Sequence, residues 1–86
     1  MTQAELKQGF IFQFSNQAFQ ESIGKDGWVE AEVSLRNEKT NTWANGFRIM
    51  FNGKLIHSCK TFKSLENRLN ILKERWDLVQ TDKFTL

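Results

Sequence analysis

The chain has 86 residues, of which 40% are hydrophobic and 26% are charged, and its formal net charge is +2. This length fits one domain over residues 1–86, and so small a net charge does not by itself indicate a nucleic-acid partner. The charge is uneven, because residues 1–43 hold four Lys/Arg against six Asp/Glu, whereas residues 44–86 hold eight against four. The second half is therefore the basic half of the molecule.

The lengths of the apolar runs and the cysteine count argue against a membrane-spanning, secreted or disulfide-bonded protein. No apolar run approaches the roughly 18 residues of a membrane span, and the N-terminus lacks the basic-then-apolar plan of a signal peptide. The single cysteine cannot form an internal disulfide, which suits a reducing compartment. We therefore expect a cytoplasmic protein with no membrane partner.

The N-terminal segment has the signature of a short helix. Thr2 and Glu5 stand at capping-box spacing, and Ala4 and Leu6 follow the same local pattern, which predicts a helix over residues 2–8. Gly9 is expected to end it, because glycine is a poor residue for a helix interior.

Residues 10–23 allow two interpretations. The run FIFQF, which starts at Phe10, alternates aromatic residues and has the composition of a strand. A rival interpretation continues one helix through Ile23, since Leu6, Phe10 and Phe14 are four positions apart. The choice between a strand, a helix or both stays open for this segment.

The clearest strand pattern covers Trp28–Arg36, after a turn at Gly24–Gly27. Every second residue from Val29 to Leu35 is apolar, which predicts one dry face and one wet face, with the charged residues on the wet face. A polar loop, Asn37–Asn45, is expected to follow.

Asn52-Gly53 is a strong hairpin signal, because a two-residue type I′ turn needs positive φ at both positions. It joins the expected strands Phe47–Phe51 and Lys54–Cys59. The register of such a turn sets Ile49 opposite Ile56 and Arg48 opposite His57. We therefore expect His57 and Cys59 on the wetter face of the hairpin, away from Phe47, Ile49 and Phe51.

The C-terminal region carries one amphipathic helix over Ser64–Val79, with Ser64 as its N-cap and residues 80–86 as a tail. The sequence thus predicts an α+β fold: an antiparallel meander of three or four strands, a helix packed across its dry face and a short N-terminal helix. The apolar face of the C-terminal helix consists of Leu65, Leu69, Leu72, Trp76 and Val79.

Residues that could support catalysis are few. His57 and Cys59 are the only residues of their kinds, and two positions apart on a strand they are too far apart for a nucleophile and its base. They also supply at most half of a zinc site. Glu30 and Glu32 are best explained as solvated strand residues. We expect no enzyme, no metal and no cofactor.

A binding surface is the alternative to catalysis. Ile71 and Leu78 form a second apolar strip on the helix, with Arg75 between them and Arg68 on the same flank. Such a strip either packs inside the domain or, rimmed by arginine, forms a protein interface. Trp43, in a polar loop, either folds over the sheet edge or anchors a partner. These five residues are the candidate protein-binding site.

The basic half also supports a second hypothesis, nucleic-acid binding, with tryptophan as a stacking platform. Binding of this kind depends on several cations that share one surface. The candidate cations are Arg48, Lys54, Lys60 and Lys63.

The region Trp43–Trp76 resembles the arm-type DNA-binding domain of tyrosine recombinases in its layout. The likeness rests on Gly53-Lys54 in the hairpin and on Thr61-Phe62-Lys63-Ser64 at the helix start. It implies DNA reading by basic and polar residues of an open sheet face. The chain departs from this pattern where Glu30 and Glu32 would repel phosphate.

The compact, proline-free chain also resembles, by type only, small phage-encoded anti-CRISPR and other anti-defence proteins. This resemblance implies a phage or mobile-element inhibitor that occupies a surface of a host protein or complex, and it carries over no residue. We therefore expect a non-enzymatic protein that acts by stoichiometric protein–protein contact, with nucleic-acid binding as the alternative. The sequence leaves the choice between monomer and homodimer open.

Overall fold

The computed structural model describes residues 1–24, 27–33, 36–37, 42–43 and 46–85. Three helices and seven strands are assigned within these residues. In chain order they are α1 (Gln3–Lys7), β1 (Phe10–Ser15), α2 (Gln17–Ile23), β2 (Val29–Val33), β3 (Arg36–Asn37), β4 (Thr42–Trp43), β5 (Phe47–Phe51), β6 (Lys54–Cys59), α3 (Phe62–Trp76) and β7 (Val79–Thr85).

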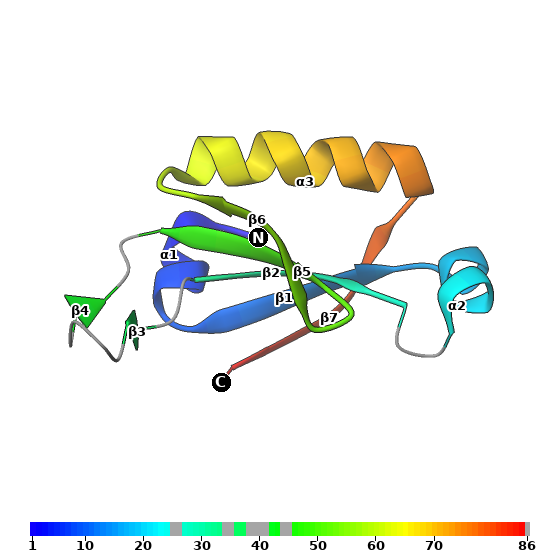
Figure 1. The fold of residues 1–86 in the computed structure, drawn as a ribbon, viewed down its shortest axis with the longest axis horizontal. Coiled ribbons are helices and arrows are strands. Elements are labelled where there is room, and N and C mark those ends of the chain that lie inside the picture. The colour runs from blue at the N-terminus through cyan, green and yellow to red at the C-terminus, as the bar shows by residue number, and fades with distance from the viewer. Residues whose placement is uncertain (25–26, 34–35, 38–41, 44–45, 86) are drawn as a thin grey trace.

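Five of the strands form one antiparallel sheet in the order β6-β5-β2-β1-β7, and α3 lies across one face of it (Figure 1). The expected α+β fold, with its antiparallel sheet, packed C-terminal helix and short N-terminal helix, is confirmed. The strand number differs from the expected three or four. The additional strand is β7, which comes from the segment expected to be a tail. Because α3 leads from β6 at one edge of the sheet to the other edge, β7 completes the sheet there.

The bounds of α3 explain how β7 arises. The helix begins two residues before the predicted N-cap, because the hydroxyl of Thr61 accepts the backbone N–H of Ser64. It ends at Trp76, where Asp77 takes a left-handed conformation with φ 53°. That residue turns the chain out of the helix, so Val79 starts a strand beside β1 instead of extending the apolar face of α3.

Residues 10–23 form both a strand and a helix, and the interpretation as one long helix is wrong. Gly9 has φ 95° and separates α1 from β1, a conformation that favours glycine. Asn16 then ends the strand and caps α2, since its side-chain oxygen accepts the backbone N–H of Phe19. Phe19 is buried, so this short helix has a defined packing contact.

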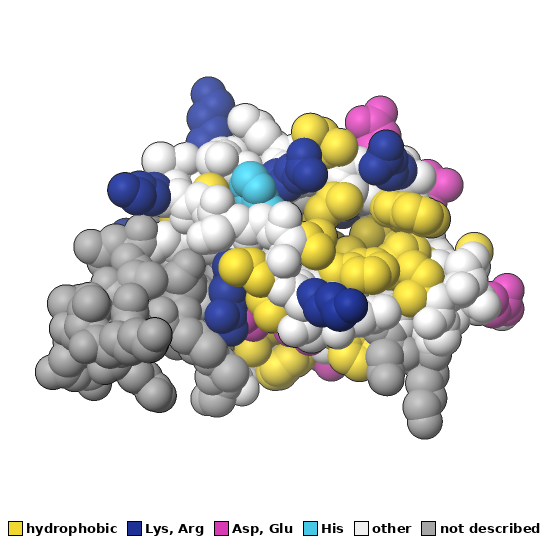
Figure 2. All heavy atoms as spheres, in the orientation of Figure 1, with side chains coloured by type: hydrophobic (Ala, Val, Ile, Leu, Met, Phe, Trp, Pro, Cys, Tyr) yellow, Lys and Arg dark blue, Asp and Glu magenta, His cyan; other side chains and the backbone are white. Residues whose placement is uncertain are grey.

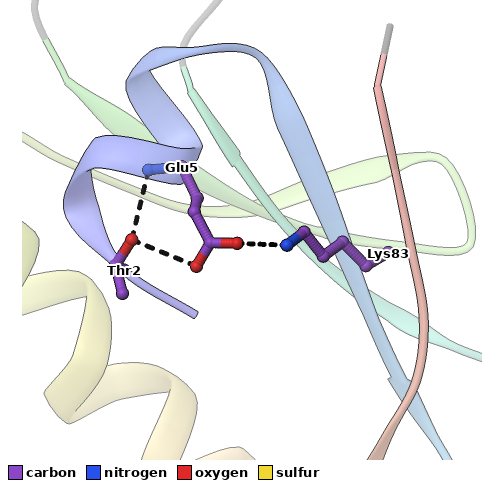
Figure 3. A network of polar contacts seen from close by, with 3 residues as sticks. All are labelled: Thr2, Glu5 and Lys83. Carbon is purple, nitrogen blue, oxygen red and sulfur yellow. Dashed lines mark hydrogen bonds and ion pairs between the residues drawn. The ribbon is translucent and has the colours of Figure 1, made fainter.

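The expected helix at the N-terminus is present as α1, and Thr2 caps it. The Thr2 hydroxyl accepts the backbone N–H of Glu5 and donates to its carboxylate (Figure 3). The same carboxylate forms an ion pair with Lys83 of β7. Because Lys83 also lies 4.6 Å from the ring centroid of Phe10, the two ends of the chain are joined at this corner.

This contact gives a testable pH dependence. The pKa of the Glu5 carboxyl is lowered from its ordinary value, mainly by the hydrogen bond from Lys83. The hydroxyl of Thr2 also lowers this pKa, whereas desolvation raises it by less than Lys83 lowers it. A carboxyl whose pKa is lowered in the folded state stabilises that state above its unfolded pKa, and the gain is lost as pH falls through the folded pKa. Lys83→Met should raise the Glu5 pKa toward its ordinary value, measured by carboxyl NMR titration.

The matched control for this prediction is Lys7→Met, which removes a positive charge from α1 itself. It should leave the Glu5 titration nearly unchanged, since the ion pair with Lys83 stays intact. Equal effects of the two substitutions on the Glu5 pKa would mean that net charge, and not this contact, sets the titration.

The hairpin register differs from the prediction. A β-bulge beside Ile49 shifts the pairing by one residue, so that Ile49 is opposite His57 and Phe47 is opposite Cys59. His57 and Cys59 therefore face α3, not the wetter face, and Ile56 is the extra residue of the bulge. A bulge of this kind cannot be deduced from the turn alone.

The core lies between α3 and the sheet. As predicted, Val29 and Ala31 of β2 face α3 and are buried, while Leu35 lies outside the described residues. Glu32 on the opposite face is also buried, where an ion pair with Arg48 replaces its contact with water. The core cluster consists of Leu6, Phe12, Phe14, Phe19, Val29, Ala31, Phe47, Ile49, Leu65, Leu69 and Leu78.

Candidate protein-binding face

The two flanks of α3 have different surroundings. On one flank, Lys73 lies 5.2 Å from the ring centroid of Phe14 in β1, and the same flank borders Gln80 of β7. The opposite flank carries Arg68, Ile71 and Arg75, which repeat at spacings of three and four. Since the first flank faces β1 and β7, the second lies on the side of the edge strand β6.

Large hydrophobic side chains are exposed on this side of the molecule. Ile71 and Trp76 of α3 are 55% and 46% exposed, and Ile56 of β6 is 42% exposed. Leu55 of β6 is 58% exposed, but it is opposite Met50 and therefore lies on the sheet face away from α3. Figure 2 shows hydrophobic side chains gathered between the C-terminal half of α3 and the β5–β6 hairpin. An exposed apolar patch of this kind is typical of an interaction site.

Aromatic contacts hold this patch in place. Phe19 of α2 packs edge-on against both Phe51 and Trp76, with ring centroids 5.8 and 5.4 Å apart. Phe51 is in turn paired with Lys54 across the hairpin. The contacts therefore connect α3 to the tip of the hairpin through a buried ring, so that the exposed part of Trp76 lies on a rigid base.

Positive charges surround the patch. Lys54, Arg68 and Arg75 are exposed. Among the described residues, the ion pairs are Arg48 with Glu32 and Lys83 with Glu5, so none involves these three cations. We call this surface the β6-side face, and it consists of Lys54, Ile56, Arg68, Ile71, Arg75 and Trp76.

The structure brings together three of the five residues predicted for protein binding, namely Arg68, Ile71 and Arg75. The prediction for Leu78 is wrong: its side chain is only 4% exposed and belongs to the core. The reason is the helix end at Trp76, after which Leu78 no longer continues the helical strip. Trp43 has a backbone assignment in β4, but its side chain lies outside the described residues.

The four residues predicted for nucleic-acid binding do not share one surface. Lys60 and Lys63 line a hollow of about 600 Å³ at the start of α3. Lys54 lies at the other end of β6. Arg48 is opposite Ser58, not His57 as predicted, and is paired with Glu32 on the sheet face away from α3. The basic half of the chain is therefore divided among three places.

The surroundings of His57 and Cys59 differ from those of a nucleophile and its base. Cys59 donates from Sγ to the carbonyl oxygen of Phe47 at 3.8 Å. Nε2 of His57 is buried and makes no hydrogen bond to the part of the chain that the structure describes. That part also contains no cluster of three metal-ligating side chains, and none of its helices has the length and hydrophobicity to cross a membrane.

No protein-family model, curated protein or solved structure matches the chain at a significant level. The face is therefore interpreted from its own geometry. The sequence did not indicate Ile56 or Trp76 as part of this face, and it assigned Trp76 to the buried side of the helix. The hairpin itself was a clear signal, but nothing in the sequence indicates that β6 is an edge strand.

Proposed function

We propose that this protein is a non-enzymatic binding module that acts by stoichiometric contact with another protein through the β6-side face. The observation that carries the proposal is the exposure of three large hydrophobic side chains, Ile56, Ile71 and Trp76, beside two arginines without ion pairs among the described residues. Aromatic residues and arginine are enriched in protein interfaces, and fixed anchors lose little entropy on binding.

The site supports contact with a protein better than contact with nucleic acid. Nucleic-acid binding gains its affinity from several cations along one surface, whereas this face combines three cations with exposed hydrophobic side chains. A small inhibitor of a host defence complex is one protein that would use such a face. The partner that we propose is accordingly a protein or protein complex, and its identity is a matter for experiment.

The test is quantitative capture of partners from bacterial lysate with and without nuclease. Arg68→Glu together with Arg75→Glu should weaken capture by at least about tenfold, because reversed charges at an interface repel the groups that the arginines attract. Thermal stability should stay nearly unchanged, since both side chains are exposed.

The matched control is Lys60→Glu together with Lys63→Glu, which changes the net charge equally but at the hollow before α3. It should leave capture of the protein partner intact. If instead this control abolishes capture and nuclease treatment removes the captured material, nucleic-acid binding at the hollow replaces the proposal. Equal losses in both double variants would mean a non-specific charge effect.

A further inference from the structure

We propose that the β6-side face receives an extended, acidic and apolar segment of the partner, which adds to the sheet as a sixth strand beside β6. This inference rests on the proposed function and specifies the chemistry of the partner. It combines three observations: β6 ends the sheet, its side chains are exposed, and the helix flank above it is cationic.

The backbone of β6 supplies the first argument. In the sheet order β6 has β5 as its neighbour on one side and no strand on the other within the described residues. An edge strand presents N–H and C=O groups that a partner strand can pair with, a mode of recognition in which main-chain hydrogen bonds supply affinity. Leu55 and Ile56 lie on this edge and provide apolar contacts for the added strand.

The flank of α3 supplies the second argument. Arg68, Ile71 and Arg75 lie on the flank of α3 opposite Lys73, which contacts Phe14 of β1, so a strand beside β6 passes next to them. Lys54 stands at the hairpin end of the same edge. An acidic side chain on the added strand would pair with these cations, while an apolar one would pack on Ile71 or Ile56.

The bulge at Ile56 limits the length of the pairing. A bulge disrupts the ladder locally, so regular pairing is available along His57–Cys59, where β6 follows β5 in register. The added strand is therefore short, and side-chain contacts complete the interface, with Ile56 and Trp76 on the α3 side and with Leu55 on the other face of the sheet. This arrangement explains why large apolar residues are exposed at the hairpin end of β6, where the ladder is irregular.

Charge argues against two other arrangements. In an antiparallel pairing of two copies centred on His57, Lys54 of each copy would face Lys60 of the other, and the arginines of both copies would approach each other. At the opposite edge, β7 carries Asp82, which disfavours an acidic segment, and its Lys83 is already paired with Glu5. An acidic partner strand therefore fits β6 better than either alternative.

The experiment is a titration of the ¹⁵N-labelled protein with a capped peptide of about ten residues that alternates glutamate and valine. We expect slower hydrogen exchange at the amides of His57–Cys59 and shifts at Arg68 and Arg75. A peptide that alternates lysine and valine should bind at least about tenfold more weakly, as should the glutamate peptide N-methylated at every residue, which has no backbone N–H to donate to the ladder.

Several results would overturn the inference. Equal binding of the acidic and basic peptides would remove the charge argument, and unchanged binding after N-methylation would remove strand addition. Protection of β6 that rises with protein concentration without peptide would identify a second copy as the occupant. If no peptide binds while capture from lysate still depends on Arg68 and Arg75, the inference fails but the proposed function stands.

Discussion

Replacing Leu78 by Ala is expected to lower the free energy of unfolding by about 2–4 kcal/mol. The side chain is 4% exposed and packs in the core cluster, although it follows the end of α3. Its removal costs the transfer free energy of the lost methyl groups and leaves a cavity that the neighbouring side chains fill only in part. Urea unfolding followed by tryptophan fluorescence measures the change.

Ile71→Ala is the matched control, because both substitutions shorten an aliphatic side chain in one C-terminal region. Ile71 is 55% exposed, so its substitution should change stability by no more than about 0.5 kcal/mol. Similar losses of stability in the two variants would contradict the division between core and binding face. If only Leu78→Ala lowers the free energy of unfolding, then Leu78 belongs to the core and Ile71 to the exposed face, as the structure indicates.

Local patterns were sufficient for most of the fold. Capping by Thr2, the alternation in β2 and the Asn52-Gly53 turn each depend on neighbouring residues, and the structure contains all three features. The pattern around Val79 was misleading, since its spacing continues that of the helix. What ends α3 is the left-handed Asp77, and aspartate adopts that conformation too seldom for the sequence to predict it.

The candidate site was less predictable than the fold, because it depends on which strand lies at the edge. If another strand followed β6, the backbone edge of β6 would be paired and closed to a partner, and the sequence of β6 would not differ. The position of β7 beside β1 leaves β6 exposed, and that position results from the path of α3 across the whole sheet. Only Arg68, Ile71 and Arg75, on the outward flank of the helix, could be recognised from spacing.

Asn16 connects the fold to the binding face. Its side-chain oxygen caps α2 by accepting the N–H of Phe19, and its Nδ2 donates to the carbonyl oxygens of Trp76 and Asp77 at 2.7 and 2.9 Å. One side chain thus forms hydrogen bonds with backbone groups at the start of α2 and at the end of α3. Since Phe19 also packs against Trp76, this contact fixes the aromatic base of the β6-side face.

Asn16→Ala is expected to lower the free energy of unfolding by about 2 kcal/mol, because it removes an N-cap and two further hydrogen bonds near the surface. Asn16→Ser retains a good N-cap but cannot reach the carbonyl groups at the end of α3, so it should lose about half as much. Thermal and urea unfolding of the three proteins measure the difference. If Ser and Ala were equally destabilising, the cap would contribute nothing and the link to α3 would account for the whole loss. If Ser matched the native protein, Trp76 would be held by its packing on Phe19 alone.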